Sequence, residues 1–201
     1  LQTLPTEDFP QTDGGDLPHR FALPAAELRG LVDRTRFAIS TEETRYYLNG
    51  IFMHTTSSEG NDVMRTVATD GHRLARVEMP VPQGAAGMPG IIIPRKTVNE
   101  LRKLIDEITD DIDIALSETS VRFAFNNAVL TSKLIDGTFP DYERVIPTGN
   151  DKSLNVDCRS FAEAVDRVAT ISTEKSRAVK LAVAGNNLVL TASSPDNGTA
   201  R

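Results

Sequence analysis

The sequence lacks tryptophan, has one cysteine, and only 5% of its 201 residues are aromatic. A single cysteine, Cys158, cannot form an internal disulfide, which favours a reducing compartment and predicts a cytoplasmic protein. No apolar run approaches the roughly 18 residues of a membrane span, and the first residues lack the basic-plus-apolar pattern of a signal peptide. The sequence therefore predicts no membrane partner.

Basic residues are also fewer than acidic ones. The chain has 22 basic and 28 acidic residues, a formal net charge of −6. Proteins that coat DNA depend on contacts between cations and phosphates, so this balance argues against that mode of binding. The 39% of hydrophobic residues and 25% of charged residues are ordinary for a globular protein with a buried core.

Patterns typical of metal and cofactor sites are missing as well. The three histidines, His19, His54 and His72, share no metal-ligand spacing, and no acidic segment has the spacing of a calcium loop. The glycine-rich segment 84–90 lacks the Gly-Lys-Ser/Thr ending of a phosphate loop. We expect neither a metal nor a cofactor.

What the sequence does contain is an internal repeat. Residues 27–33 and 100–106 share the pattern E-L-R-x-L-[VI]-D at an offset of 73 residues. Each copy follows a short apolar run and a proline, Pro24 or Pro94. Both copies therefore predict a strand that leads into an amphipathic helix, with the apolar positions at the spacing of a helix.

The pattern predicts an α+β fold in which a strand, a helix and three strands occur twice within residues 17–135. Asn126-Asn127 is a plausible hairpin turn, and two S/T-x-x-E patterns, Thr97 to Glu100 and Ser160 to Glu163, predict capping boxes. The expected helices are 24–39, 97–108 and 160–171, and the expected strands are 17–23, 46–56, 65–69, 73–79, 90–94, 111–117, 120–125, 128–134, 179–183 and 188–192.

A longer period suggests more than one such domain. V-D-R followed by I-S-T-E begins at residue 32 and again at residue 165, and L-x4-F-P begins at residues 4 and 134. These offsets of about 130 residues predict the tail of one domain at 1–12, a complete domain at 13–148, and part of a further domain at 149–201. The alternative is a single domain with irregular terminal segments.

Two segments could carry chemistry. In Thr69–Arg73, Asp70 could orient His72 as a general base, but no nucleophile pattern accompanies them, and Asp-Gly between two strands is also a hairpin signal. In Arg45–Gly50, Tyr46 or Tyr47 could stack on an unpaired base beside a phosphate-binding Arg45. The start of a half-buried strand explains the second segment equally well.

Charge is distributed unevenly between the expected helices and the rest of the chain. The helical segments 21–39, 95–108 and 159–178 contain eleven basic and eight acidic residues, a sum of +3, which leaves −9 for everything else. A ring with its helices inside would use such a separation.

Four strings resemble one known family closely: RYYLNG at 45–50, TVATDGHRLA at 66–75, PRK at 94–96 and SKLIDGTFPDY at 132–142. They are similar to the bacterial DNA polymerase III beta subunits, the sliding clamps, and the resemblance covers essentially the whole chain. It implies three domains per subunit and a head-to-tail homodimer around duplex DNA, with helices lining the hole and sheets outside. Such a clamp tethers its polymerase without catalysis and contacts backbone phosphates without reading bases.

The resemblance also implies two sets of site residues. The pocket for peptides of polymerases, the clamp loader and repair proteins would comprise Leu48, Thr69, Gly71, His72, Arg73, Leu74, Pro140, Arg144 and Val145. The side facing double-stranded DNA would comprise Arg45, Tyr46, Tyr47, Lys96, Arg29, Arg36, Arg102 and Lys103. Glu42 is left out of the second set because its charge suits DNA poorly.

The resemblance further implies that a first domain and half of a third are absent. We therefore expect this chain neither to close a ring nor to bind peptides at full strength. Two functions of other classes stay open: a stand-alone peptide-binding module that does not encircle DNA, and a hydrolase that uses Asp70 and His72.

Overall fold

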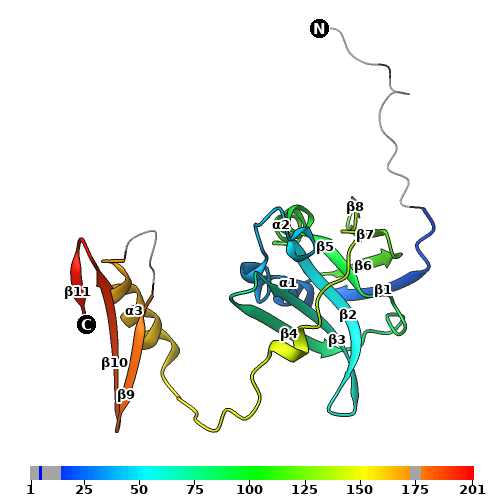
Figure 1. Cartoon of the computed structure of the whole chain (residues 1–201). Helices are drawn as coiled ribbons and strands as arrows, with labels where there is room; N and C mark the ends of the chain where they lie inside the picture. Colours follow the sequence, from blue (N-terminus) through cyan, green and yellow to red (C-terminus); the bar gives the residue numbers. More distant parts are fainter. Residues whose placement is uncertain (1–4, 6–14, 173–177) are drawn as a thin grey trace. The chain divides into compact units, whose positions relative to one another are not determined.

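The computed structural model describes residue 5 and residues 15–172 and 178–201. The chain divides into two compact units, one ending at Val145 and one beginning at Ile146 (Figure 1). Apart from Pro5, the expected domain tail at 1–12 lies outside the described residues.

The N-terminal unit has the doubled order that the repeat predicts. A strand, a helix and three strands are followed by the same series again, and short 3-10 helices occur at Arg36–Ala38, Tyr46–Leu48 and Tyr142–Val145. The elements are β1 (His19–Pro24), α1 (Ala25–Asp33), β2 (Gly50–Ser58), β3 (Asn61–Thr69), β4 (Leu74–Pro80), β5 (Ile91–Pro94), α2 (Arg95–Leu104), β6 (Asp111–Leu116), β7 (Ser120–Phe125) and β8 (Ala128–Lys133).

The two halves of this unit exchange their first strands. One antiparallel sheet has the order β1-β6-β7-β8, and the other has the order β4-β3-β2-β5. Phe21 of β1 is opposite Ile114 of β6, and Ile93 of β5 is opposite Ile51 of β2. Each sheet thus combines a three-stranded meander from one half with a strand from the other half, so neither half completes a sheet alone.

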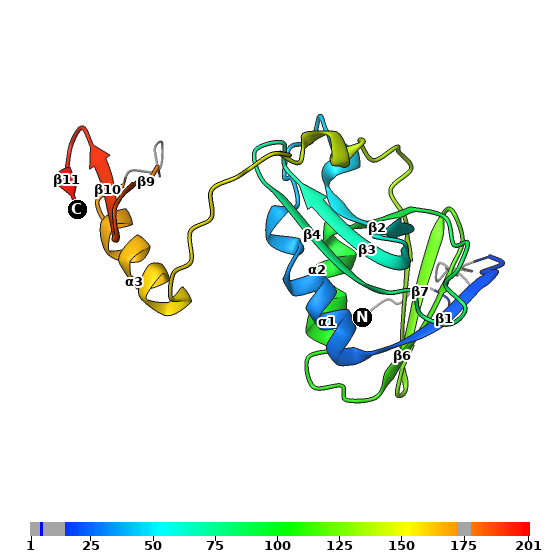
Figure 2. The same cartoon turned by 90° about the horizontal axis from the view of Figure 1, so that it is seen from below.

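The core lies between the sheets and the helices. In β6, Ile112, Ile114 and Leu116 are buried while Asp111 and Asp113 are exposed, the alternation of a strand with one solvated face. The buried faces of α1 and α2 complete this core, and the two helices lie side by side in both views of the unit (Figures 1 and 2).

The first helix is shorter than expected. The prediction of a helix over 24–39 is wrong beyond Asp33, where α1 ends. The buried hydroxyl of Thr35 donates to the carbonyl oxygen of Leu31 at 2.6 Å, and the chain then forms the 3-10 turn at Arg36–Ala38. A threonine side chain that bonds back to the preceding turn favours a bend at this point.

The expected strand beginning at Tyr46 is also wrong. Tyr46–Leu48 is a 3-10 helix, and β2 begins at Gly50. Gly50 sits where an added Cβ would lie 2.3 Å from the carbonyl oxygen of Ile93, so the strand pairing with β5 requires glycine. The β2–β3 hairpin turns at Glu59 and Gly60, both with positive φ, which lengthens β3 to start at Asn61 rather than at 65.

Neither capping box forms. In α2 the N-cap is Pro94, and the hydroxyl of Thr97 pairs with that of Ser132 at 2.6 Å instead. At the third helix the N-cap is Asp157, whose carboxylate accepts from the backbone N–H of Ser160 at 2.9 Å. The observed N-caps lie three residues upstream of the predicted ones. Pro94 continues directly from β5 and provides no side-chain cap, whereas the carboxylate of Asp157 caps the third helix.

In its described ranges, 146–172 and 178–201, the C-terminal unit contains one helix and one sheet. Its elements are α3 (Cys158–Ala169), β9 (Lys180–Ala184), β10 (Asn187–Ser194) and β11 (Gly198–Ala200), with sheet order β11-β10-β9. Its buried core comprises Val168, Leu190 and Ala192, and every residue of β9 is exposed. No helix among the described residues is long and apolar enough to cross a bilayer.

Candidate functional site

A cationic hollow lies beside α1 and α2. It has a volume of about 370 Å³ and is lined by Arg36, Arg95, Lys96, Asn99, Glu100 and Lys103. Four cations against one carboxylate give this hollow a positive charge, which suits phosphate groups. Three of the eight predicted DNA-facing residues, Arg36, Lys96 and Lys103, meet here.

Arg95 is a cation of this hollow that the predicted set does not include. It begins α2, and its side chain forms no ion pair within the described ranges 15–172 and 178–201. The string Pro94-Arg95-Lys96 contains the signal, because it places two consecutive cations in the first turn of α2.

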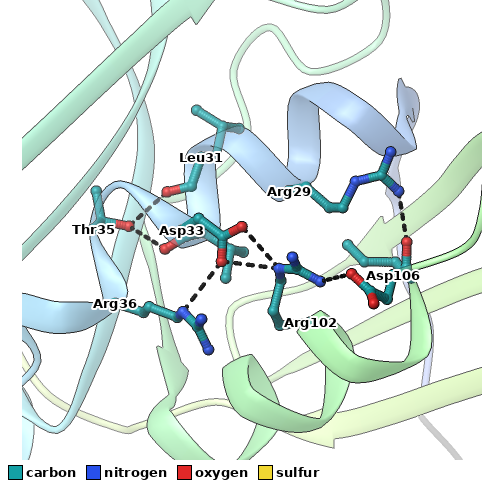
Figure 3. Close-up of polar contacts among 9 residues, drawn as sticks. Arg29, Leu31, Asp33, Thr35, Arg36, Arg102 and Asp106 are labelled. Atoms are coloured by element: carbon teal, nitrogen blue, oxygen red, sulfur yellow. Dashed lines mark hydrogen bonds and ion pairs between the residues drawn. The ribbon is translucent and has the colours of Figure 1, made fainter. Parts of the chain in front are cut away.

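Two other predicted DNA-facing arginines are tied to helix ends (Figure 3). Arg29 of α1 donates to the carbonyl oxygens of Ile105 at 2.6 Å and Ile108 at 2.7 Å, just beyond α2. These two bonds join α1 to the turn that follows α2, where the oxygen of Ile105 also accepts the backbone N–H of Ile108 at 3.3 Å. Arg29 therefore braces the two helices against each other.

Arg102 of α2 forms the corresponding contact to the end of α1. Its Nε lies 2.9 Å from the carboxylate of Asp33 at the end of α1, and its Nη1 lies 2.6 Å from Asp106 (Figure 3). Hydrogen bonding and the charge of Arg102 lower the pKa of Asp106. Arg29 and Arg102 occupy the same place in the two sequence repeats, so the repeat produces a reciprocal brace.

Asp33 connects this brace with the cationic hollow. The same carboxylate that accepts from Arg102 lies 3.2 Å from the Nε of Arg36, which lines the hollow (Figure 3). Asp33 thus offsets part of the charge of Arg36, and Glu100 lies 3.1 Å from Nζ of Lys103. Arg95 and Lys96 therefore carry the larger share of the positive charge of the hollow.

The remaining predicted DNA-facing residues lie before β2. Arg45 forms a two-pronged ion pair with Glu42, with Nε–Oε2 and Nη2–Oε1 distances of 2.8 and 2.7 Å. Tyr46 and Tyr47 follow in the 3-10 helix with their rings edge to face at 5.8 Å, and the side chain of Tyr46 is exposed. Glu42, which the prediction left out, holds Arg45 in place.

The turn between β3 and β4 contains most of the predicted peptide-binding residues. The carboxylate of Asp70 accepts from the backbone N–H groups of His72 and Arg73, each at 3.0 Å, and from Arg73 Nε at 3.1 Å. Burial alone would raise the pKa of Asp70, but these bonds outweigh it and lower the pKa. Gly71 has φ of +89°, a conformation that side chains other than glycine rarely adopt.

This geometry does not favour the hydrolase hypothesis. The Asp70 carboxylate is occupied by backbone groups and by Arg73, and among the described residues no hydrogen bond joins it to the imidazole of His72. A general base needs an orienting partner and a nucleophile in reach. In the part of the chain that the structure describes, no three His, Cys, Asp or Glu side chains group as metal ligands.

The turn adjoins the residues that precede β2. An added Cβ on Gly71 would lie 2.7 Å from Nη1 of Arg45, and the guanidinium of Arg73 lies 5.5 Å from the centre of the exposed Phe37 ring. Leu74 is half-buried, whereas Leu48 is 4% exposed and offers a peptide little surface. The residues predicted for DNA and for peptide therefore meet at Arg45 and Gly71.

Pro140, Arg144 and Val145 lie on a different segment, the chain that follows β8. Arg144 pairs with Asp141 at 2.7 Å, and Val145 is 68% exposed. The ring contacts and hydrogen bonds of this segment go to β2 and β3, through Phe139 and Tyr142.

Comparisons with known proteins identify the family. A family model described as the DNA polymerase III beta subunit, central domain, matches residues 22–141, and the model of the C-terminal domain of the same subunit matches residues 143–201. The chain belongs to the DNA polymerase III beta subunit family. The resemblance seen in the sequence is thereby confirmed, as is the α+β clamp fold.

Named relatives agree with this assignment. The beta sliding clamp of Caulobacter vibrioides (strain NA1000 / CB15N) is 54% identical over 200 residues, covering 100% of this chain and 54% of the relative. That of Escherichia coli (strain K12) is 40% identical over 196 residues, covering 98% of this chain and 52% of the relative. The chain thus spans about half the length of the curated relatives it matches.

Solved structures of the family match all or nearly all of the chain. The sliding clamp from Bartonella birtlesii bound to griselimycin is 55% identical, with a TM-score of 0.94, and the match covers 100% of this chain and 54% of that one. The beta subunit from Pseudomonas aeruginosa is 37% identical, with a TM-score of 0.88, covering 98% and 53% respectively.

Proposed function

We propose that this chain is the middle domain and part of the third domain of a processivity factor for the bacterial replicative DNA polymerase. The match of two successive beta-subunit family models to residues 22–141 and 143–201 supports this proposal. In the full-length protein, a homodimeric ring encircles duplex DNA in the cytoplasm and tethers the polymerase, the clamp loader and repair proteins. The subunit is a non-catalytic accessory, and no cofactor is needed.

The cationic hollow is the proposed DNA contact. Arg95, Lys96 and Lys103 would meet backbone phosphates, which carry no sequence information, so the protein could slide. The net charge of −6 is compatible with this role. A closed ring stays on DNA because it encircles the duplex, so a few inward-facing cations are enough for the phosphate contacts.

The turn at 69–74 and the segment at 140–145 are the proposed peptide interface. Leu74, Pro140 and Val145 would receive apolar anchors of a linear peptide, and Arg73 and Arg144 would frame its polar groups. Griselimycin, the ligand of the Bartonella birtlesii structure, can be added to a peptide-binding measurement to learn whether it competes with the peptide.

Peptide binding is the decisive test for this chain. A fluorescein-labelled peptide from the polymerase tail should bind in fluorescence anisotropy, and Arg73→Ala with Leu74→Ala should weaken binding at least about tenfold with an unchanged circular dichroism spectrum. Arg76→Ala, an exposed arginine on the same strand, is the matched control. Undiminished affinity in the double variant would refute the pocket assignment.

DNA binding is tested separately. Arg95→Gln with Lys96→Gln should weaken binding of a labelled duplex and reduce the slope of log affinity against log salt by about two. Lys133→Gln on β8 is the control. For the full-length protein, retention on circular DNA and loss after linearisation is expected, and equal loss from both forms would refute encirclement.

A further inference from the structure

Arg65 is a buried arginine that none of the predicted sites includes. It lies on β3 with a side chain that is 3% exposed. Its Nε donates to Glu78 of β4 at 2.9 Å, and its Nη1 donates to Glu143 at 2.6 Å and to the hydroxyl of Tyr142 at 2.8 Å. One guanidinium therefore joins the sheet to the segment that follows β8.

The hydroxyl of Tyr142 has two hydrogen-bonding partners. It accepts from Arg65 and lies 2.9 Å from Nε2 of His54, while Nδ1 of His54 lies 3.3 Å from the carbonyl oxygen of Thr55. This pattern assigns a neutral His54 that carries its proton on Nδ1 and accepts the Tyr142 proton at Nε2. Tyr142 is thus fixed by strands β2 and β3 together.

Aromatic packing holds the same segment three residues earlier. The ring of Phe139 stacks on Phe52 of β2 at 4.9 Å with an interplanar angle of 8°, and Phe52 stacks in turn on His54 at 4.6 Å. Phe139 and Tyr142 are buried, whereas Pro140 and Arg144 beside them are exposed. Buried anchors therefore alternate with exposed residues that point to solvent.

We propose that Arg65 is a positioning residue for the peptide interface: through Tyr142 and Glu143 it fixes the segment that presents Pro140, Arg144 and Val145. This inference rests on the proposed peptide-binding function. Arg144 has only a surface ion pair with Asp141 and Val145 is exposed, so these contacts cannot order the segment themselves. Holding it before the peptide arrives removes part of the entropy cost of binding.

The test uses variants that leave the buried arginine in place. Tyr142→Phe removes only the hydroxyl, and Glu143→Gln removes the charge of a side chain that is 61% exposed. The double variant should bind the polymerase-tail peptide about three- to tenfold more weakly. Proteolysis uses Tyr142→Phe alone, because Glu143 adjoins the cleaved bond: trypsin should cleave after Arg144 faster than in the wild type, with cleavage after Lys152 as the internal reference.

Two controls separate positioning from stability. Glu118→Gln removes an exposed carboxylate in the β6–β7 turn of the other sheet. Ile112→Val destabilises the unit through the core of that sheet, where Ile112 is fully buried. Both should keep the wild-type peptide affinity and the wild-type cleavage rate at Arg144.

The outcomes distinguish the inference from the proposed function. Faster cleavage with weaker peptide binding supports the positioning role. Faster cleavage with unchanged affinity overturns that role and leaves the peptide interface standing. An unchanged cleavage rate shows that the contacts of Arg65 do not fix the segment, and it overturns the positioning role whatever the peptide affinity. A wild-type chain that does not bind the peptide overturns the proposed interface, and with it the positioning role.

Discussion

Three arginines of the N-terminal unit are engaged in internal contacts that their residue type does not reveal. Arg29 and Arg102 brace the helices, and Arg65 is buried among two carboxylates and a tyrosine. Sequence reasoning assigned Arg29 and Arg102 to DNA and did not single out Arg65. Charge and helical position can be read from sequence, but whether a guanidinium reaches a carbonyl or a carboxylate about 70 residues away depends on tertiary packing.

The same limit applies to the candidate site. The turn residues Thr69–Leu74 could be predicted because they are contiguous and carry a specific string. The two-pronged ion pair between Glu42 and Arg45 could not, because the charge of Glu42 shows that it suits DNA poorly but not which cation lies beside it. Both sets of site residues stay predictions.

His54 makes stability depend on pH. Burial lowers its pKa in the folded protein below the ordinary value near 6.5. In the unfolded chain His54 takes up a proton as the pH falls through about 6.5, while the folded protein resists protonation. The unfolded state then binds more protons, so the free energy of unfolding decreases from this pH downward, until the folded pKa is passed.

We therefore expect the free energy of unfolding of the N-terminal unit to decrease between about pH 7 and pH 5. His54→Gln, which does not titrate, should flatten this part of the curve. Urea unfolding at a series of pH values measures it. The account is wrong if the variant retains the wild-type slope between these values.

At the scale of secondary-structure elements, the doubled order was predictable and the strand exchange was not. The heptapeptide repeat identifies two equivalent halves, and the alternation in β6 and β7 identifies their buried faces. The first strand of each half can pair with the meander of its own half or with that of the other half. Both pairings bring similar apolar strands together. A repeat makes the two halves alike and therefore contains no information about that choice.

The helix brace should contribute measurably to stability. Arg29→Met leaves the carbonyl oxygens of Ile105 and Ile108 without their side-chain donor, and it should lower the free energy of unfolding by about 1–3 kcal/mol. Arg34→Met, an exposed arginine just after α1, should change it by less than about 0.5 kcal/mol. Equal effects of both variants in chemical denaturation would contradict the brace.

The β2–β3 hairpin contains a residue that fits its turn poorly. Glu59 has φ of 51° and Gly60 has φ of 81°, as in a two-residue turn that favours Asn-Gly. Asparagine adopts this conformation more readily than glutamate, so Glu59→Asn should raise the free energy of unfolding by up to about 1 kcal/mol. Thermal unfolding measures the change, and a lower midpoint in Glu59→Asn than in the wild type would refute it.

At the scale of the whole molecule, the two units have very different cores. Among the residues that the structure describes, the N-terminal core cluster contains 26 buried apolar residues, and the C-terminal one contains Val168, Leu190 and Ala192. Since apolar burial is the main favourable contribution to folding, the C-terminal unit should be much less stable. The long repeat predicts a partial domain after residue 149, but it does not indicate how little apolar surface that domain buries.

We expect the chain to unfold in two steps. In rising urea, amide hydrogen exchange of peptides from α3 and β10 should lose protection before that of peptides from β3 and β6. Limited proteolysis should leave a fragment ending near Val145. A single transition in which all peptides lose protection together would show that the two units stabilise each other.

The exchange of β1 and β5 between the two halves has a consequence for chain continuity. The segment 81–90, which connects the halves, contributes no strand to either sheet, whereas the exchanged strands contribute one to each. A backbone cut there would leave two pieces that hold each other through both sheets, in the manner of split-protein complementation. Continuity of the polypeptide and integrity of the domain are thus separable at this position.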